Sequence, residues 1–117
     1  MELELVEYLI REHHTLLPRL EALALKNLLH NQKLDAAADG ELRAKRKALM
    51  LRAGWLSDSD EVLSLLNDGD IAFRRRLARW IYNEQGGETL LNKCPRCHRL
   101  ARTAKAKQCR YCGHDWH

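Results

Sequence analysis

The sequence of 117 residues predicts a mainly α-helical fold of about five short helices, followed by a C-terminal segment of different character. Leu, Ala, Lys, Arg and Glu, which have high helix propensity, fill residues 1–85. β-branched residues are scarce throughout, so a large sheet is not expected. Apolar residues recur at intervals of three and four, as they do along the buried face of an amphipathic helix.

The first two helices are separated at a proline. Apolar residues follow helical spacing from Leu3 to Leu23, which alone would predict one long helix. Pro18 disfavours the α conformation at the preceding residue and is tolerated in the first turn of a helix. We therefore expect helices at about 2–14 and 17–36.

Glycines and short polar clusters bound the remaining helices. The segment 35–40 is predicted to end the second helix, and Gly54 and Gly86-Gly87 are further stop signals. Between these signals we expect helices at about 41–53, 59–67 and 71–84. Thr89–Asn92 is predicted to form a short strand. Large aromatic side chains are expected to anchor the helical core, namely Trp55, Phe73 and Trp80.

Charge divides the chain into two regions. Residues 1–89 contain thirteen Lys and Arg against fifteen Asp and Glu, whereas residues 90–117 contain seven against one, a net charge of +6. The chain contains no apolar run long enough for a transmembrane helix, and it begins with Glu2 and Glu4 rather than a basic signal sequence. We therefore expect a cytoplasmic protein whose thiols stay reduced.

The four cysteines form one constellation, Cys94-Pro-Arg-Cys97 and Cys109-Arg-Tyr-Cys112-Gly113, with eleven residues between the two pairs. Two Cys-x-x-Cys turns that face each other supply four thiolates in a tetrahedron, the arrangement of a structural Zn²⁺ site. We predict such a site and a zinc ribbon over residues 87–117, with a helical domain over residues 1–86. Redox pairs, a disulfide or a rubredoxin-like iron site are the alternatives.

Three histidines lie beside this constellation, at His98, His114 and His117. They are not expected to be ligands, because four cysteines already complete the coordination of zinc. His98 stands where such turns usually carry glycine, so a positive φ is expected there.

The two cysteine turns resemble the zinc ribbons of ribosomal proteins, transcription factors and small bacterial proteins. More narrowly, the residues from Leu91-Asn92-Lys93-Cys94-Pro95 to His114-Asp115-Trp116 resemble the end of a group of small uncharacterised bacterial proteins that end in a CPxC…CxxC zinc ribbon. The resemblance covers about a quarter of the chain. It implies a structural zinc ion and a bacterial source, and it implies no activity.

Basic residues surround the cysteines, and Tyr111 and Trp116 are interleaved with them. Such a pattern can bind phosphates and stack bases. The same cations could instead offset the negative charge of a zinc–thiolate centre, or contact an acidic protein partner. The candidate contact residues for nucleic acid or an acidic partner are Lys93, Arg96, Arg99, Arg102, Lys105, Lys107, Arg110 and Trp116.

No catalytic motif accompanies the cysteines, since the sequence has neither a phosphate-binding glycine loop nor a Ser-His-Asp pattern, and we do not expect an enzyme. The leading hypothesis is a non-enzymatic interaction protein whose helical region binds a protein partner or forms a homodimer. The alternatives are a nucleic-acid-binding or regulatory protein, a small bacterial immunity or antitoxin protein, and a redox switch that releases zinc. Neither a membrane nor a small-molecule substrate is expected as a partner.

Overall fold

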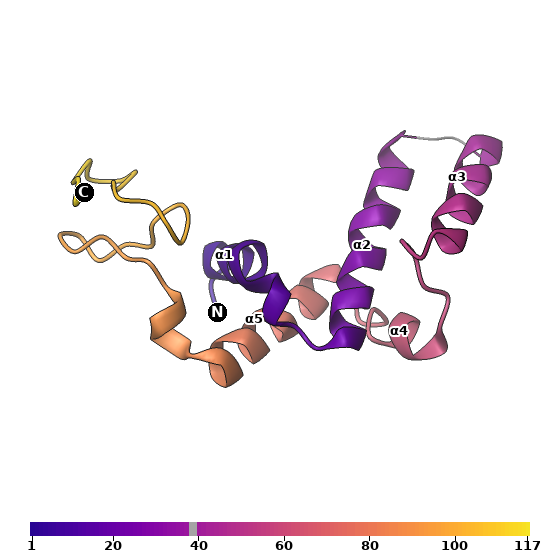
Figure 1. Ribbon diagram of the computed structural model, residues 1–117, viewed down its shortest axis with the longest axis horizontal. Helices are drawn as coiled ribbons and strands as arrows, with labels where there is room; N and C mark the ends of the chain where they lie inside the picture. The colour runs from indigo at the N-terminus through magenta and orange to yellow at the C-terminus, as the bar shows by residue number, and fades with distance from the viewer. Residues whose placement is uncertain (38–39) are drawn as a thin grey trace. The chain divides into compact units, whose positions relative to one another are not determined.

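The computed structural model describes residues 1–37 and 40–117, which form five α-helices, two 3₁₀ helices and no sheet (Figure 1). The α-helices are α1 (Leu3–His13), α2 (Arg19–Ala37), α3 (Gly40–Arg52), α4 (Asp60–Ser64) and α5 (Asp70–Gln85). The 3₁₀ helices are η1 (His14–Leu16) and η2 (Gly87–Leu90). The predicted mainly helical fold is confirmed. Part of the segment predicted to end the second helix, residues 38–39, lies outside the described residues.

Two local predictions were wrong. Residues 89–92 do not form a strand, because the Thr89 hydroxyl and the Thr89 N–H both donate to the Gly86 carbonyl oxygen and hold the backbone in η2. The predicted helix at 59–67 is shorter, since α4 ends at Ser64. Beyond it, N–H groups donate to carbonyls three residues earlier, as in Asn67 to Ser64, and the chain turns before Gly69, where φ is +92°.

The chain divides into two compact units. The first consists of residues 1–16 and 74–117, and the second of residues 17–73. The cysteine segment therefore shares a unit with α1 and with most of α5. The predicted boundary between a domain at 1–86 and a ribbon at 87–117 concerns independent folding and stays a prediction.

In the first unit, α1 and α5 bury apolar residues at helical spacing. Val6, Leu9 and Ile10 of α1 are buried, as are Leu77, Ala78 and Ile81 of α5. Tyr8 lies in the same stretch of α1 and is 1% exposed. Among the described residues, no helix combines the length and apolar character needed to cross a membrane.

In the second unit, α2 contacts both α3 and α4. A buried polar residue, Asn27, fixes the loop before α4: its side-chain amide donates to the Ser57 carbonyl and accepts from the Ser57 N–H, each at 2.7 Å. This pair of hydrogen bonds satisfies both polar groups of a side chain that is 1% exposed.

The predicted aromatic anchors differ in burial. Phe73 is 1% exposed, as expected for a core residue, and Trp80 is half-buried. Trp55 is 52% exposed, so its prediction as a core anchor was wrong. The turn at Gly54, where φ is +78°, directs Leu56 into the core and leaves Trp55 at the surface, stacked on His30 with ring centroids 5.7 Å apart.

Candidate metal centre

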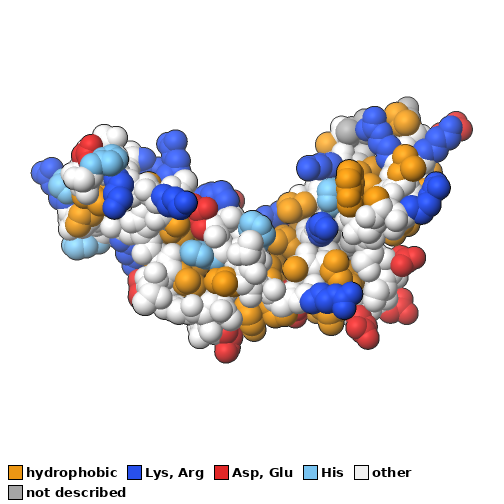
Figure 2. All heavy atoms as spheres, viewed as in Figure 1, with side chains coloured by type: hydrophobic (Ala, Val, Ile, Leu, Met, Phe, Trp, Pro, Cys, Tyr) orange, Lys and Arg blue, Asp and Glu red, His pale blue; other side chains and the backbone are white. Residues whose placement is uncertain are grey.

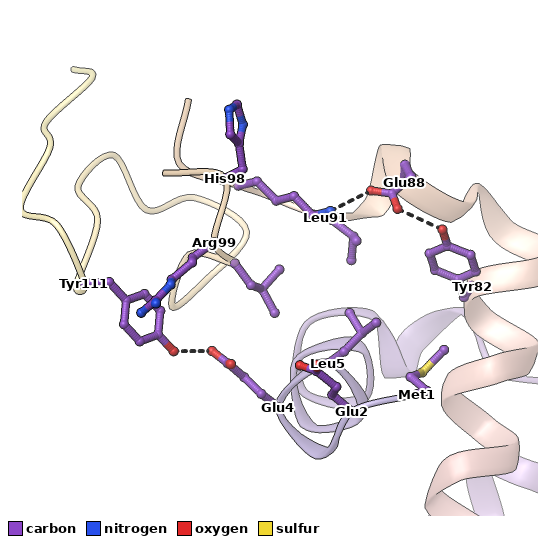
Figure 3. Close-up of a pocket in the computed structure, with 12 residues that line it drawn as sticks. Met1, Glu2, Glu4, Leu5, Tyr82, Glu88, Leu91, His98, Arg99 and Tyr111 are labelled. Atoms are coloured by element: carbon purple, nitrogen blue, oxygen red, sulfur yellow. Dashed lines mark hydrogen bonds and ion pairs between the residues drawn. The ribbon is translucent and has the colours of Figure 1, made fainter. Parts of the chain in front are cut away.

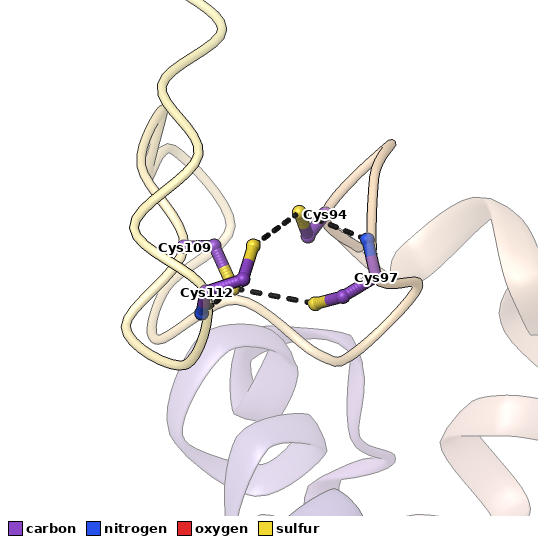
Figure 4. A group of neighbouring side chains, drawn as sticks. All are labelled: Cys94, Cys97, Cys109 and Cys112. Atoms are coloured by element: carbon purple, nitrogen blue, oxygen red, sulfur yellow. Dashed lines mark hydrogen bonds between the residues drawn. The ribbon is translucent and has the colours of Figure 1, made fainter.

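The four cysteines converge in the first unit, as Figure 4 shows. Their Sγ atoms all lie within 4.8 Å of one another. Two of the sulfur pairs that join the two turns are Cys94 and Cys112 at 3.7 Å and Cys97 and Cys109 at 3.5 Å. Cys94 and Cys109 are buried, Cys97 is half-buried and Cys112 is exposed.

Each cysteine pair sits on a tight turn whose backbone N–H groups point at sulfur. In the first turn, the N–H groups of Arg96 and Cys97 donate to the Cys94 Sγ, each at 3.4 Å. The predicted positive φ at His98 is confirmed, at +62°. The His98 N–H donates to the Cys94 carbonyl at 2.9 Å, and the positive φ then turns the chain so that the Arg99 carbonyl accepts from the Cys94 N–H at 2.9 Å.

The second turn repeats this backbone pattern at a constant offset in the sequence. The N–H groups of Tyr111 and Cys112 donate to the Cys109 Sγ, and the Gly113 N–H, at φ +76°, donates to the Cys109 carbonyl. Isolated antiparallel bridges flank both turns, pairing Lys93 with Leu100 and Gln108 with Asp115. The centre is thus built from two copies of one motif that face each other, the first knuckle (residues 92–101) and the second knuckle (residues 107–116).

This geometry fits a tetrahedral metal ion. With metal–sulfur bonds of about 2.3 Å, neighbouring sulfurs of a tetrahedron are about 3.8 Å apart. The separations of 3.7 and 3.5 Å between sulfurs of the two turns are close to that value. Four close cysteines can therefore hold a metal ion, and a set of four thiolates leaves no coordination position open for water or substrate.

The cysteines differ in pKa because their backbone donors and neighbouring thiols differ. The Cys112 and Tyr111 N–H groups stabilise the Cys109 thiolate and lower its pKa to about 6. The pKa of Cys97 rises to about 11, because burial and hydrogen bonds with the other sulfurs outweigh the N–H of Arg99. A metal ion needs all four as thiolates, so its binding must release protons.

The first knuckle is fastened to α1 through Tyr8. The Tyr8 hydroxyl donates to the Leu90 carbonyl at 3.3 Å and accepts from the Asn92 N–H at 3.2 Å. His13 Nε2 also lies 3.0 Å from the Leu90 carbonyl oxygen. Asn92 in turn donates through its side-chain amide to the carbonyls of Thr103 and Ala106, which orders the loop between the knuckles.

Two carboxylates of α1 hold the rest of the segment. Glu12 accepts from the Ala104 N–H at 2.8 Å. Glu4 accepts from the Tyr111 hydroxyl at 2.7 Å and pairs with Arg110, and these partners lower its pKa. This role of α1 was not predicted from the sequence. The signal was present, because Glu4, Tyr8 and Glu12 recur every fourth residue and so share one helix face.

The structure separates the candidate contact cations into two groups. Lys93 pairs with Glu88 at 3.1 Å, Arg110 pairs with Glu4, and Arg99 lies over the Tyr111 ring at 4.8 Å. Four others make no ion pair with any residue in 1–37 or 40–117: Arg96, Arg102, Lys105 and Lys107. Trp116 is half-buried, and its ring centroid lies 6.1 Å from that of His114.

A cavity of about 520 Å³ lies between α1 and the first knuckle (Figure 3). Leu5, Leu91 and Leu100 supply apolar lining. Several of its polar lining groups are engaged with one another, since Glu4 accepts from Tyr111, while Glu88 accepts from Tyr82 and pairs with Lys93. These internal pairs leave few polar groups to orient a ligand, so we assign this cavity no function.

Comparisons with known proteins found no relative of this protein. The sequence matches no protein-family model, no curated protein and no solved structure. The structure supports one part of the resemblance to zinc-ribbon proteins, namely the cluster of Cys94, Cys97, Cys109 and Cys112.

Proposed function

We propose that the protein is a non-enzymatic interaction protein whose C-terminal segment is held together by one structural Zn²⁺. Cys94, Cys97, Cys109 and Cys112 are the proposed ligands. Four thiolates at tetrahedral spacing favour zinc, and a closed coordination sphere favours a structural over a catalytic ion. Iron is the alternative for a four-cysteine site, and elemental analysis of protein purified under reducing conditions distinguishes the two metals.

The observation that carries the interaction role is the exposure of α3. All thirteen of its residues are described, and none is buried. Leu42 and Leu49 are 46% and 58% exposed, and Figure 2 shows hydrophobic and basic side chains interspersed along this helix. Although α3 contacts α2, it has no fully buried residue, whereas most helical stability comes from burying an apolar face. A protein partner or a second copy of this chain would supply that burial.

Substitution on α3 tests the proposal against a matched control. Leu49→Asp places a charge on the exposed apolar surface, whereas Leu3→Asp changes a leucine of equal exposure, 57%, in the other compact unit. Sedimentation over a range of concentrations reports self-association, and affinity purification from nuclease-treated extract reports other partners.

We expect Leu49→Asp to abolish the association that Leu3→Asp retains. A wild-type protein that stays monomeric and retains the same proteins as Leu49→Asp would contradict the proposal. The nuclease treatment removes partners that are bridged by nucleic acid.

A second candidate function is nucleic-acid binding by the basic segment. It is favoured by Arg96, Arg102, Lys105 and Lys107, since salt-dependent binding requires cations that are free to contact phosphates. Retardation of a nucleic acid at low salt, lost as the salt concentration rises, is the expected result. No retardation at low salt would eliminate this candidate.

A further inference from the structure

The strongest indication of a further binding site is a hollow beside the second knuckle. It has a volume of about 500 Å³, within the range of small-ligand sites. Three of its lining residues are cationic, Arg102, Lys107 and Arg110, and His117 adds an imidazole. Gln108 adds an amide and no carboxylate lines the hollow, although the metal-site residue Cys109 is part of its lining.

The positive charge around this hollow is only partly compensated within the unit. Arg110 pairs with Glu4, and His117 pairs with Asp115. Arg102 and Lys107 have no carboxylate partner among the described residues. The Arg102 carbonyl also accepts from the Arg11 guanidinium at 2.6 Å, which brings a further cation close to the same loop.

These cations are not explained as partners of the cysteine sulfurs. The donors to Cys94 and Cys109 are the backbone N–H groups of the two knuckles. Within the described part of the chain, no Arg or Lys side chain donates to a cysteine sulfur. Long-range charge balance remains as a rival explanation, and it predicts equal effects from every cation of the segment.

We propose that this hollow binds a phosphate group, carried either by the backbone of a nucleic acid or by free phosphate. An arginine offers paired donors that match phosphate oxygens, and a lysine adds a mobile point charge. The two uncompensated cations, Arg102 and Lys107, match the charge of a phosphate and would repel each other less once it is bound. The inference is independent of the partner proposed for α3, and it gives the nucleic-acid candidate a specific site.

The test compares variants that remove the same charge from different places. Arg102→Ala and Lys107→Ala remove cations of the hollow, and Arg96→Ala removes an equally unpaired cation outside its lining. Backbone contacts at these positions persist, since the Arg102 and Lys107 carbonyls are the hydrogen-bonding groups there. Zinc-loaded full-length proteins of equal metal content are titrated with inorganic phosphate and with a short oligouridylate. Amide chemical shifts and fluorescence anisotropy report binding.

Each hollow variant is expected to weaken phosphate binding roughly tenfold, since a hydrogen bond to a charged group is lost. Arg96→Ala should leave it within about twofold of wild type, because surface charges contribute little. If the ligand is a nucleic acid, the oligouridylate binds more tightly than phosphate, and each hollow variant lowers the salt slope by roughly one. If it is free phosphate, only the phosphate titration saturates.

Three results would overturn the inference. The first is a wild-type protein whose amide resonances at the hollow do not respond to either ligand. The second is an Arg96→Ala variant that loses as much affinity as Arg102→Ala and Lys107→Ala, which would indicate charge balance. The third is a polyglutamate peptide that binds at the hollow more tightly than both phosphate ligands, which would indicate an acidic protein partner.

Discussion

Replacing Tyr8 by phenylalanine should destabilise the first compact unit, although it leaves the packing of the ring intact. Tyr8 is 1% exposed, and burial raises the pKa of its hydroxyl, which stays protonated at neutral pH. The variant loses a donor to the Leu90 carbonyl at 3.3 Å and an acceptor for the Asn92 N–H at 3.2 Å. Leu90 keeps its contact with His13, so the Asn92 N–H is the group left without a partner.

The cost follows from that one orphaned donor. A fully buried polar group without a partner costs about 1–3 kcal/mol, and because Asn92 is half-buried and the bonds at Tyr8 are rather long, we expect a loss of about 1–2 kcal/mol. Tyr82→Phe is the control, because it removes the same hydroxyl group but loses only one hydrogen bond, to Glu88, in an exposed setting. Its effect should be clearly smaller.

Urea unfolding of the zinc-loaded proteins measures the difference, with amide hydrogen exchange to locate it. Protection should fall around residues 90–106, because Asn92 also orders the loop that follows the first knuckle. If Tyr8→Phe and Tyr82→Phe unfold at the same urea concentration as wild type, the tyrosine does not fasten the knuckle to α1. The attachment inferred from its hydrogen bonds would then be wrong.

Three further predictions concern the metal, the second unit and acid. Chelating the metal should increase amide exchange across residues 93–116 and in α1 while leaving α2 protected. Hydrogen-exchange mass spectrometry measures this effect. Unchanged exchange near the cysteines would rule out a structural ion. Asn27→Ala should lower the free energy of unfolding by about 2–4 kcal/mol, since both Ser57 backbone groups lose their partner, and thermal denaturation checks this. The pKa of Glu4 is lowered from 4.5, first by the Tyr111 hydroxyl, so its carboxylate stabilises the fold above that pH. The stability difference between wild type and Glu4→Gln should therefore shrink as the pH falls through the lowered value, and a difference constant with pH would contradict this.

Local signals in the sequence predicted most of the secondary structure. Pro18 separates the first two helices as expected, and the helices predicted at 41–53 and 71–84 agree with α3 and α5 to within one residue at each end. These features depend on propensity and on stop signals that act over a few residues. The strand expected at 89–92 failed for the same reason, because Thr89 bonds locally to Gly86 and this local geometry prevailed.

The cysteine turns were also predictable, since the Cys-x-x-Cys spacing determines where the backbone N–H groups point. Their attachment to α1 was not, because its hydrogen bonds join residues far apart in the sequence, such as Tyr8 and Asn92. The exposure of Trp55 was missed for a related reason. Side-chain size suggests burial, but the direction of the chain after Gly54 decides whether Trp55 or Leu56 enters the core.

The repeated knuckle explains why the cations are used unequally. Because the two knuckles share one backbone pattern, Asn92 and Lys93 of the first correspond to Lys107 and Gln108 of the second. The first pair is engaged within the unit, since Asn92 bonds to Tyr8 and to the following loop, and Lys93 pairs with Glu88. The side chains of the corresponding second pair instead line the open hollow. Both knuckles contact α1, the second through Tyr111 and Arg110 to Glu4, but only in the first are the residues at these two positions engaged within the unit.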